Sequence, residues 1–240
     1  MDSQTRHALK QDKFVQATTT GLSWIEIHRA EVIRATIAAV VVLAAAVGGI
    51  IFYQHRTAQA SIALGQALEI YNSPLWQPGE PEDGTYKTIA DRSKAANQQF
   101  VDVANKYGSL EPGKIARYFA GLTDIDLAKF PDAESNLKEI SNSYNKDLAS
   151  LAKVALAGLY VQEGKTQPAI DLYKQIIEKP TDTVPASAAQ LQLAEIYEKT
   201  DPQQAKQIYA VLKDKEKATA AGQIAAQKLN PGAAQGPPIQ

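Results

Sequence analysis

The sequence predicts an all-α protein, in which a single transmembrane helix near the amino terminus precedes a solenoid of helical hairpins. Three observations predict this fold. One is an uncharged apolar run of 19 residues at 35–53. Another is a helical pattern that recurs about every 36 residues in the rest of the chain. The last is a composition rich in Ala and Gln, which favours helices over strands.

The apolar run, ATIAAVVVLAAAVGGIIFY, has the length of a membrane span. A helix of this length rises about 28 Å, close to the roughly 30 Å hydrocarbon core of a bilayer. Basic residues gather before the run, whereas Arg56 is the only Lys or Arg among the twenty residues after it. The basic residues before the run are Arg6, Lys10, Lys13, Arg29 and Arg34. Because basic flanks stay in the cytoplasm, we expect a cytoplasmic amino end and an exported carboxyl-terminal domain.

Two other interpretations of the apolar run stay open. Ala58-Gln59-Ala60 matches the A-x-A pattern at which secretory signal peptides are cleaved. Against cleavage, 34 residues precede the run, and the run is longer than the 7–15 apolar residues that such signals contain. The remaining interpretation is a buried core helix. We therefore expect a retained anchor with a span at 35–53.

The rest of the chain divides around this anchor. Ser23 and Glu26 match a capping box, which predicts an anchor helix over 23–56. We expect residues 1–22 to be a flexible cytoplasmic lead and residues 57–229 to form the solenoid, closed by a helix near 215–229. Residues 230–240 (NPGAAQGPPIQ) have the composition of a disordered tail.

Small residues in the span could form a helix-packing surface. They are spaced one turn apart, in the small-xxx-small pattern that lets a second helix approach closely. The residues are Ala44, Ala45, Gly48 and Gly49. An Ala-rich span produces the same pattern without any such partner.

The region after the span carries an internal repeat. Four predicted helices share a small residue, a large residue four positions later and an aliphatic residue three positions further, which places all three on one helix face. The sets are Ala96-Phe100-Val103, Ala133-Leu137-Ile140, Ala169-Tyr173-Ile176 and Ala205-Tyr209-Leu212. A helix with its own small residue precedes each set, at Leu64-Gly65, Ala120-Gly121, Leu156-Ala157 and Leu193-Ala194. A loop rich in Pro and Gly at 73–85 interrupts the first repeat, and Asp201 is expected to cap the last helix of the repeat region.

These repeats resemble the tetratricopeptide repeat (TPR), a helix–turn–helix unit of 34 residues, over about residues 57–216. The alternative is a generic array of helical hairpins. In TPR arrays the first helix of each hairpin lines the concave face, so the resemblance implies a protein-binding groove there. Its residues would be Ile115, Tyr118, Leu122, Ile125, Val154, Gly158, Val161, Leu191, Glu195 and Glu198. Some of these residues would instead belong to the core if the register were shifted by one.

A short lead, one span and a degenerate TPR domain together resemble the YfgM-type ancillary subunits of the Sec translocon. This resemblance implies a bacterial inner-membrane protein with a periplasmic domain that assists newly exported proteins. The implied partners are translocon subunits, a periplasmic chaperone or exported clients. The alternative is a structural scaffold of a cell-envelope assembly complex. The apolar groove favours the accessory role, because it suits many weakly held clients.

No pattern in the sequence predicts catalysis. Cysteine is absent, and the three histidines, at positions 7, 28 and 55, are not spaced to share a metal ion. Walker loops, nucleophile elbows and HExxH motifs are also absent. A net charge of −1 without a basic patch disfavours nucleic acid. We therefore expect a protein that is not an enzyme and has no cofactor, metal or small-molecule substrate.

Overall fold

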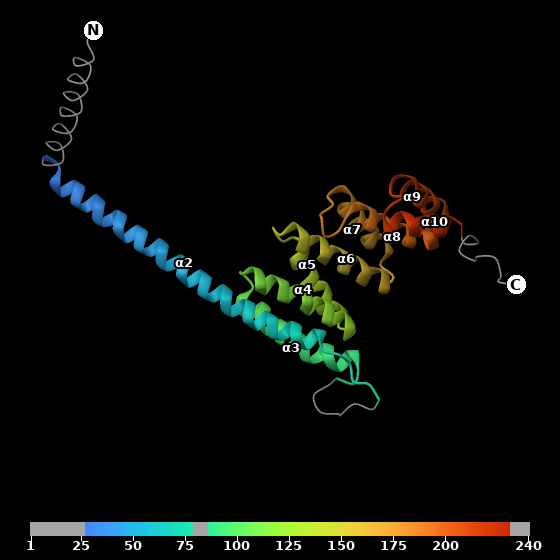
Figure 1. The fold of residues 1–240 in the computed structure, drawn as a ribbon, viewed down its shortest axis with the longest axis horizontal. Helices are drawn as coiled ribbons and strands as arrows, with labels where there is room; N and C mark the ends of the chain where they lie inside the picture. Colours follow the sequence, from blue (N-terminus) through green and yellow to red (C-terminus); the bar gives the residue numbers. More distant parts are fainter. Residues whose placement is uncertain (1–26, 79–85, 231–240) are drawn as a thin grey trace, which may run out of the picture. The chain divides into compact units, whose positions relative to one another are not determined.

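A computed structural model describes residues 27–78 and 86–230, and Figure 1 shows the order of their helices. Within these ranges every regular element is a helix, apart from one isolated bridge between Leu75 and Tyr86, which confirms the all-α fold. The predicted lead, the capping box at Ser23 and residues 231–240 lie outside the described residues. The helices are α2 (Arg29–Asn72), α3 (Ile89–Tyr107), α4 (Glu111–Asp126), α5 (Phe130–Ser141), α6 (Lys146–Gln162), α7 (Thr166–Glu178), α8 (Ala186–Thr200), α9 (Pro202–Lys215) and α10 (Ala220–Leu229).

The apolar run lies inside α2, a continuous helix of 44 residues. Its most apolar 18-residue window has a mean hydropathy of 2.6, and none of that window is buried. In the part of the chain that the structure describes, α2 is the one helix long and apolar enough to cross a membrane. A Cβ atom added at Gly48 or Gly49 would meet nothing within 4 Å, so this small-residue face is open.

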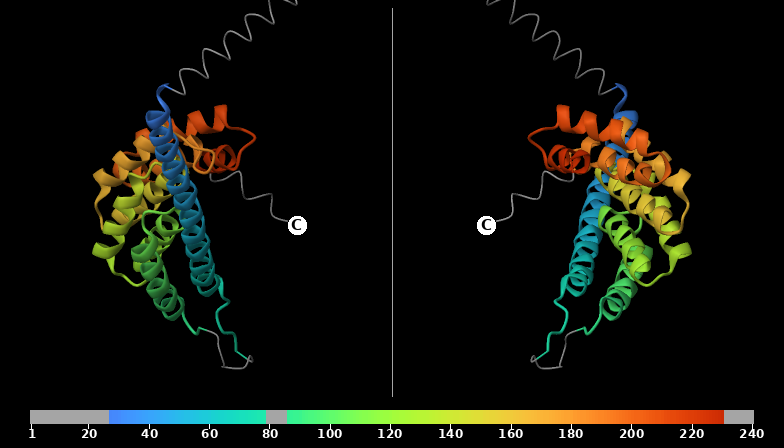
Figure 2. Two further views of the ribbon diagram at one scale, coloured as in Figure 1. Left: turned by 90° about the vertical axis from the view of Figure 1, so that its left-hand side faces the viewer. Right: turned by 90° about the vertical axis from the view of Figure 1, so that its right-hand side faces the viewer.

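The chain divides into two compact units, one ending at Arg56 and the other beginning at Thr57. In the second unit each helix from α3 to α10 packs against the next one along the chain (Figure 2). The first helices of neighbouring hairpins also touch, α4 against α6 and α8 against α10. Short loops and neighbour-only packing are the features of a helical solenoid.

The repeat found in the sequence forms the core of this unit. All twelve positions of the four sets are buried, and none is more than 4 % exposed. The small residue of the preceding helix is also buried at Ala120, Ala157 and Ala194, which lets the two helices of a hairpin approach closely. Spacing on one helix face therefore predicted the buried face correctly.

The first hairpin differs from the expected pattern at Gly65. This residue is exposed, and a Cβ atom there would meet nothing, so it does not lie at a helix crossing. Ala60, Leu64 and Ala67 form the buried face of α2 instead. The buried residues of α2 thus have the i, i+4, i+7 spacing of the second helices. They do not include an adjacent Leu–Ala pair like the one buried in α6 and in α8.

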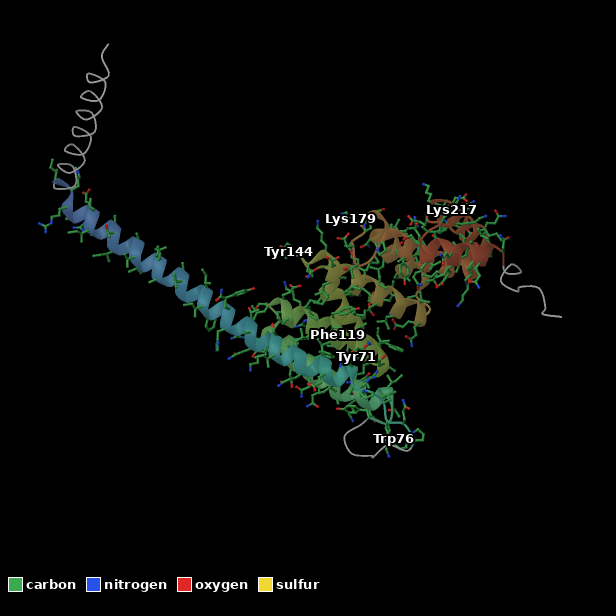
Figure 3. The ribbon with its side chains drawn as sticks, viewed as in Figure 1. Tyr71, Trp76, Phe119, Tyr144, Lys179 and Lys217 are labelled. Atoms are coloured by element: carbon green, nitrogen blue, oxygen red, sulfur yellow. The ribbon has the colours of Figure 1, made fainter. Side chains whose placement is uncertain are left out.

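Aromatic and polar contacts close the interrupted first repeat. The Tyr71 ring meets the Phe100 ring edge-on at 6.0 Å and the Phe119 ring at 5.4 Å. Figure 3 labels Tyr71 and Phe119, which lie together at this joint. The Arg92 guanidinium donates to the carbonyl of Ser73 at 2.9 Å. The end of α2 is therefore tied to α3 and α4 although a long loop separates them in sequence.

A buried polar cluster joins α3, α4 and α5. The Asn97 amide donates to Asp124 Oδ1 at 2.8 Å and to the Thr123 hydroxyl at 3.0 Å. The Asn136 amide donates to Asp124 Oδ2 at 3.0 Å. Burial raises the pKa of Asp124, and the two amides act against that rise. Both carboxylate oxygens of this buried residue therefore have donors, as burial of a carboxylate requires.

A second polar group links α5, α6 and the N-cap residue of α7 at the surface. Glu134 accepts from the Tyr160 hydroxyl at 2.9 Å and pairs with Lys138 at 2.5 Å and Lys165 at 3.4 Å. Lys138 and Tyr160 are the main causes that lower the pKa of Glu134 to about 2. The carboxylate is therefore ionised throughout the physiological range of pH.

Helix ends follow the local sequence signals. The Asp201 side chain accepts from the backbone N–H of Gln204, which confirms Asp201 as the N-cap of α9. The last helix, α10, begins at Ala220 and not near residue 215. The reason is that the Thr219 hydroxyl accepts from the N–H of Gly222 and caps the helix there.

Two glycines provide a matched test of the packing of α4 on α5. A Cβ atom at Gly121 would lie 2.7 Å from Leu137 Cγ, whereas one at Gly158 would meet nothing within 4 Å. We expect Gly121→Ala to lower the free energy of unfolding by about 1–3 kcal/mol through overpacking. Gly158→Ala should raise it by about 0.5–1 kcal/mol, because alanine favours the helix. Urea unfolding of the full chain in detergent, followed by circular dichroism, measures both; equal effects of the two substitutions would contradict the close crossing.

Candidate functional site

The first helices of the hairpins carry the residues that the sequence assigned to a groove. On α4, Ile115, Tyr118, Leu122 and Ile125 are all half-buried. Ile115, Tyr118 and Ile125 pack against the core cluster from its edge, and burial raises the pKa of Tyr118. Val154 on α6 is half-buried in the same way. These residues line one face of α4 and α6 without being enclosed, and their role in a groove stays a prediction.

A cleft of about 470 Å³ brings four of the predicted residues together. Gly158 and Val161 come from α6, and Glu195 and Glu198 come from α8. Leu191, predicted for the same groove, is 9 % exposed and belongs to the core cluster. We refer to this space below as the α6–α8 cleft.

Other residues of the α6–α8 cleft were not predicted from the sequence. They come from α7, α8 and α10: Thr166, Tyr173, Gln192, Ile196, Lys199, Thr200 and Lys228. Gln192 and Lys199 lie three residues before and four after Glu195, so helical periodicity could have found them. Lys228 has no such signal, since only the packing of α10 against α8 brings it to the cleft.

Glu198 at the rim of the cleft has its charge compensated. Lys228 Nζ lies 3.0 Å from Glu198 Oε1 and 3.2 Å from Oε2, and the Tyr209 hydroxyl donates to Oε1 at 2.9 Å. Lys228 is the largest cause that lowers the pKa of Glu198. Burial and this carboxylate together raise the pKa of Tyr209. One carboxylate thus joins α8 to both α9 and α10.

Glu195, the other carboxylate that lines the cleft, is less exposed than Glu198. Its side chain is half-buried, and no hydrogen bond or ion pair joins it to another side chain in the described ranges. Burial and then the charge of Glu195 raise the pKa of Tyr173, which forms part of the same wall. The cleft therefore presents one uncompensated carboxylate beside apolar surface.

The comparison with protein families agrees with this architecture. A family model described as "Tetratricopeptide repeat-like domain" matches residues 30–177, which is more than half of the chain. The chain belongs to the tetratricopeptide repeat-like family. No curated protein and no solved structure matches it. The matched range ends within α7, so α8, α9 and α10 continue the TPR-like array beyond it.

TPR-like domains are typically protein-interaction modules without catalytic activity. Across residues 27–78 and 86–230, no group of three or more His, Asp or Glu side chains could hold a metal ion. What the α6–α8 cleft offers is shape, apolar surface and charge. These properties serve binding of a protein segment.

The ion pair at the rim predicts how firmly α10 is held. Lys228→Gln should leave Glu198 without its cation and loosen α10 by about 0.2–1 kcal/mol, the range for exposed pairs. The amides of Ala220–Leu229 should then exchange with deuterium up to about fivefold faster, measured by mass spectrometry on the full chain. Lys217→Gln is the control, because Lys217 is exposed in the loop before α10 (Figure 3). Equal exchange in the two variants would contradict a role of the ion pair.

Proposed function

We propose that this protein is a membrane-anchored interaction module and an accessory factor of the Sec translocon and periplasmic chaperone network. The observation that carries the proposal is the α6–α8 cleft on the first-helix face of a TPR-like array, in a chain that also has a helix able to span a membrane. The cleft has a volume of about 470 Å³, which is room for side chains of an extended partner segment. Its apolar and charged groups would hold such a segment without enclosing it, which suits transient clients.

The neighbouring surface supports an extended partner. Tyr118 on α4 and Val154 on α6 are half-buried. Helix α6 also lines the cleft, and α4 packs against α6. Val161 in the cleft is 42 % exposed. A segment that followed this face could bury apolar surface on each hairpin in turn, as solenoids do with long ligands.

The anchor determines where these partners are met. The basic residues before the apolar run support a cytoplasmic amino end and a periplasmic TPR-like domain in a bacterial inner membrane. The open face at Ala44, Ala45, Gly48 and Gly49 would pack against a helix of the translocon. A scaffold of a cell-envelope assembly complex would have the same anchor but one permanent partner.

Charges placed in the apolar run test the anchor. Val41→Arg with Ala45→Arg should cost about 2.5–3.5 kcal/mol for each arginine and release the protein from membranes on alkaline extraction. Ile62→Arg is the control, since Ile62 is an exposed apolar residue after the run.

Protease added to spheroplasts should digest the TPR-like domain of the unaltered chain. Mass spectrometry of that chain should find an intact amino end, and cleavage after Ala60 would contradict the anchor.

Photocrosslinking tests the partners. We expect a benzophenone amino acid at Gly48 to capture translocon subunits, and one at Val161 to capture a periplasmic chaperone or many exported chains. Tyr144 is the control position, because it is fully exposed in the loop between α5 and α6 (Figure 3). A single envelope-assembly protein captured from Gly48 and Val161 would support the scaffold instead. Capture from Tyr144 equal to that from Val161 would contradict binding in the cleft.

A further inference from the structure

We infer that the α6–α8 cleft receives a basic side chain, Lys or Arg, from an extended partner segment with apolar residues beside it. The inference rests on the proposed function and names the partner chemistry for its binding site. Three features of the cleft carry it: an uncompensated carboxylate, an open space above a glycine, and apolar walls that suit a methylene chain.

The carboxylate is that of Glu195. Two carboxylates and two ammonium groups line the cleft, but Glu198 and Lys228 already form an ion pair. Lys199, the other cation, is exposed, and no ion pair within 4 Å joins it to Glu195 in the described part of the chain. A half-buried carboxylate has lost part of its hydration, so a cation brought by a partner would gain more here than at an exposed acid.

The space for the incoming side chain lies over Gly158. Gly158 lines the cleft, and a Cβ atom at this position would meet nothing within 4 Å, so no side chain fills the space next to it. Val161 and Ile196 form apolar parts of the wall. Lys and Arg side chains bury their methylene groups against such surfaces while the charged end reaches a polar partner.

The two carboxylates favour a basic over an acidic side chain in this space. An acidic side chain in this space would meet Glu195 and lie near Glu198, and like charges at close range are destabilising. A purely apolar side chain would cover Glu195 and leave a buried carboxylate without a donor. A guanidinium is the group that best satisfies both carboxylate oxygens, since it donates two parallel hydrogen bonds.

The test is a selection of binding peptides by the full chain in lipid nanodiscs. Random ten-residue peptides displayed on phage are selected, and the enriched ones are synthesised and measured by fluorescence polarisation. We expect Arg or Lys flanked by aliphatic residues in the enriched peptides, and about tenfold weaker binding to Glu195→Gln. Glu178→Gln is the matched control, because Glu178 is exposed at the end of α7 and does not line the cleft. Its affinity should equal that of the unaltered chain.

A further variant separates the two proposals. Gly158→Trp fills this space in the cleft, and helix content measured by circular dichroism shows whether it folds. Peptides that bind the unaltered chain, fail to bind Gly158→Trp and lack basic residues would overturn the inference while leaving the interaction module intact. Unchanged affinity for Glu195→Gln would overturn it as well. Peptides that bind Gly158→Trp and the unaltered chain equally would place binding outside the cleft, which contradicts the proposed function too.

Discussion

Close packing of helices across small buried side chains is the constraint on which this solenoid depends. The alanine that opens each repeat set, from Ala96 to Ala205, has almost no exposed surface. A larger side chain there would push neighbouring helices apart. The large residues one turn away, such as Phe100 and Leu137, fill the space that remains. Each hairpin buries its repeat face in this way, and its first helix keeps another face that is open to partners.

The α6–α8 cleft follows from this division of faces. Leu156 and Ala157 point into the core, whereas Gly158 and Val161 on the same helix stay accessible. On α8 the core takes Leu193 and Ala194, and the adjacent Glu195 stays half-buried outside the core. Helix α10 then supplies Lys228, which forms an ion pair with Glu198 and leaves Glu195 without one. Packing and binding are thus properties of neighbouring positions on the same helices.

Much of the fold could be predicted from the sequence, because burial follows a regular spacing. The repeat sets and the cap at Asp201 depend on residues within a few positions of each other, which a sequence displays directly. Gly65 was misassigned because α2 packs through Ala60, Leu64 and Ala67, a face that only the contacts with α3 and α4 define. Four of the residues that line the cleft were among those expected in a groove. Gly158, Val161, Glu195 and Glu198 were expected there from the resemblance to TPR arrays, whereas Tyr173 and Lys228 reach the cleft through packing between hairpins.

The buried cluster around Asp124 has a consequence for assembly of the array. Hairpins with similar apolar faces could pair with the wrong neighbour, and such out-of-order pairing is a characteristic misfolding route of repeat proteins. Asn97 and Asn136 bring amide donors to Asp124 from the helices on either side of it in sequence. A neighbour out of order would bury the same carboxylate without those donors, at a cost of several kcal/mol. Asp124 thus favours the native order of the first hairpins, which alanine and leucine contacts do not, because they are alike in every hairpin.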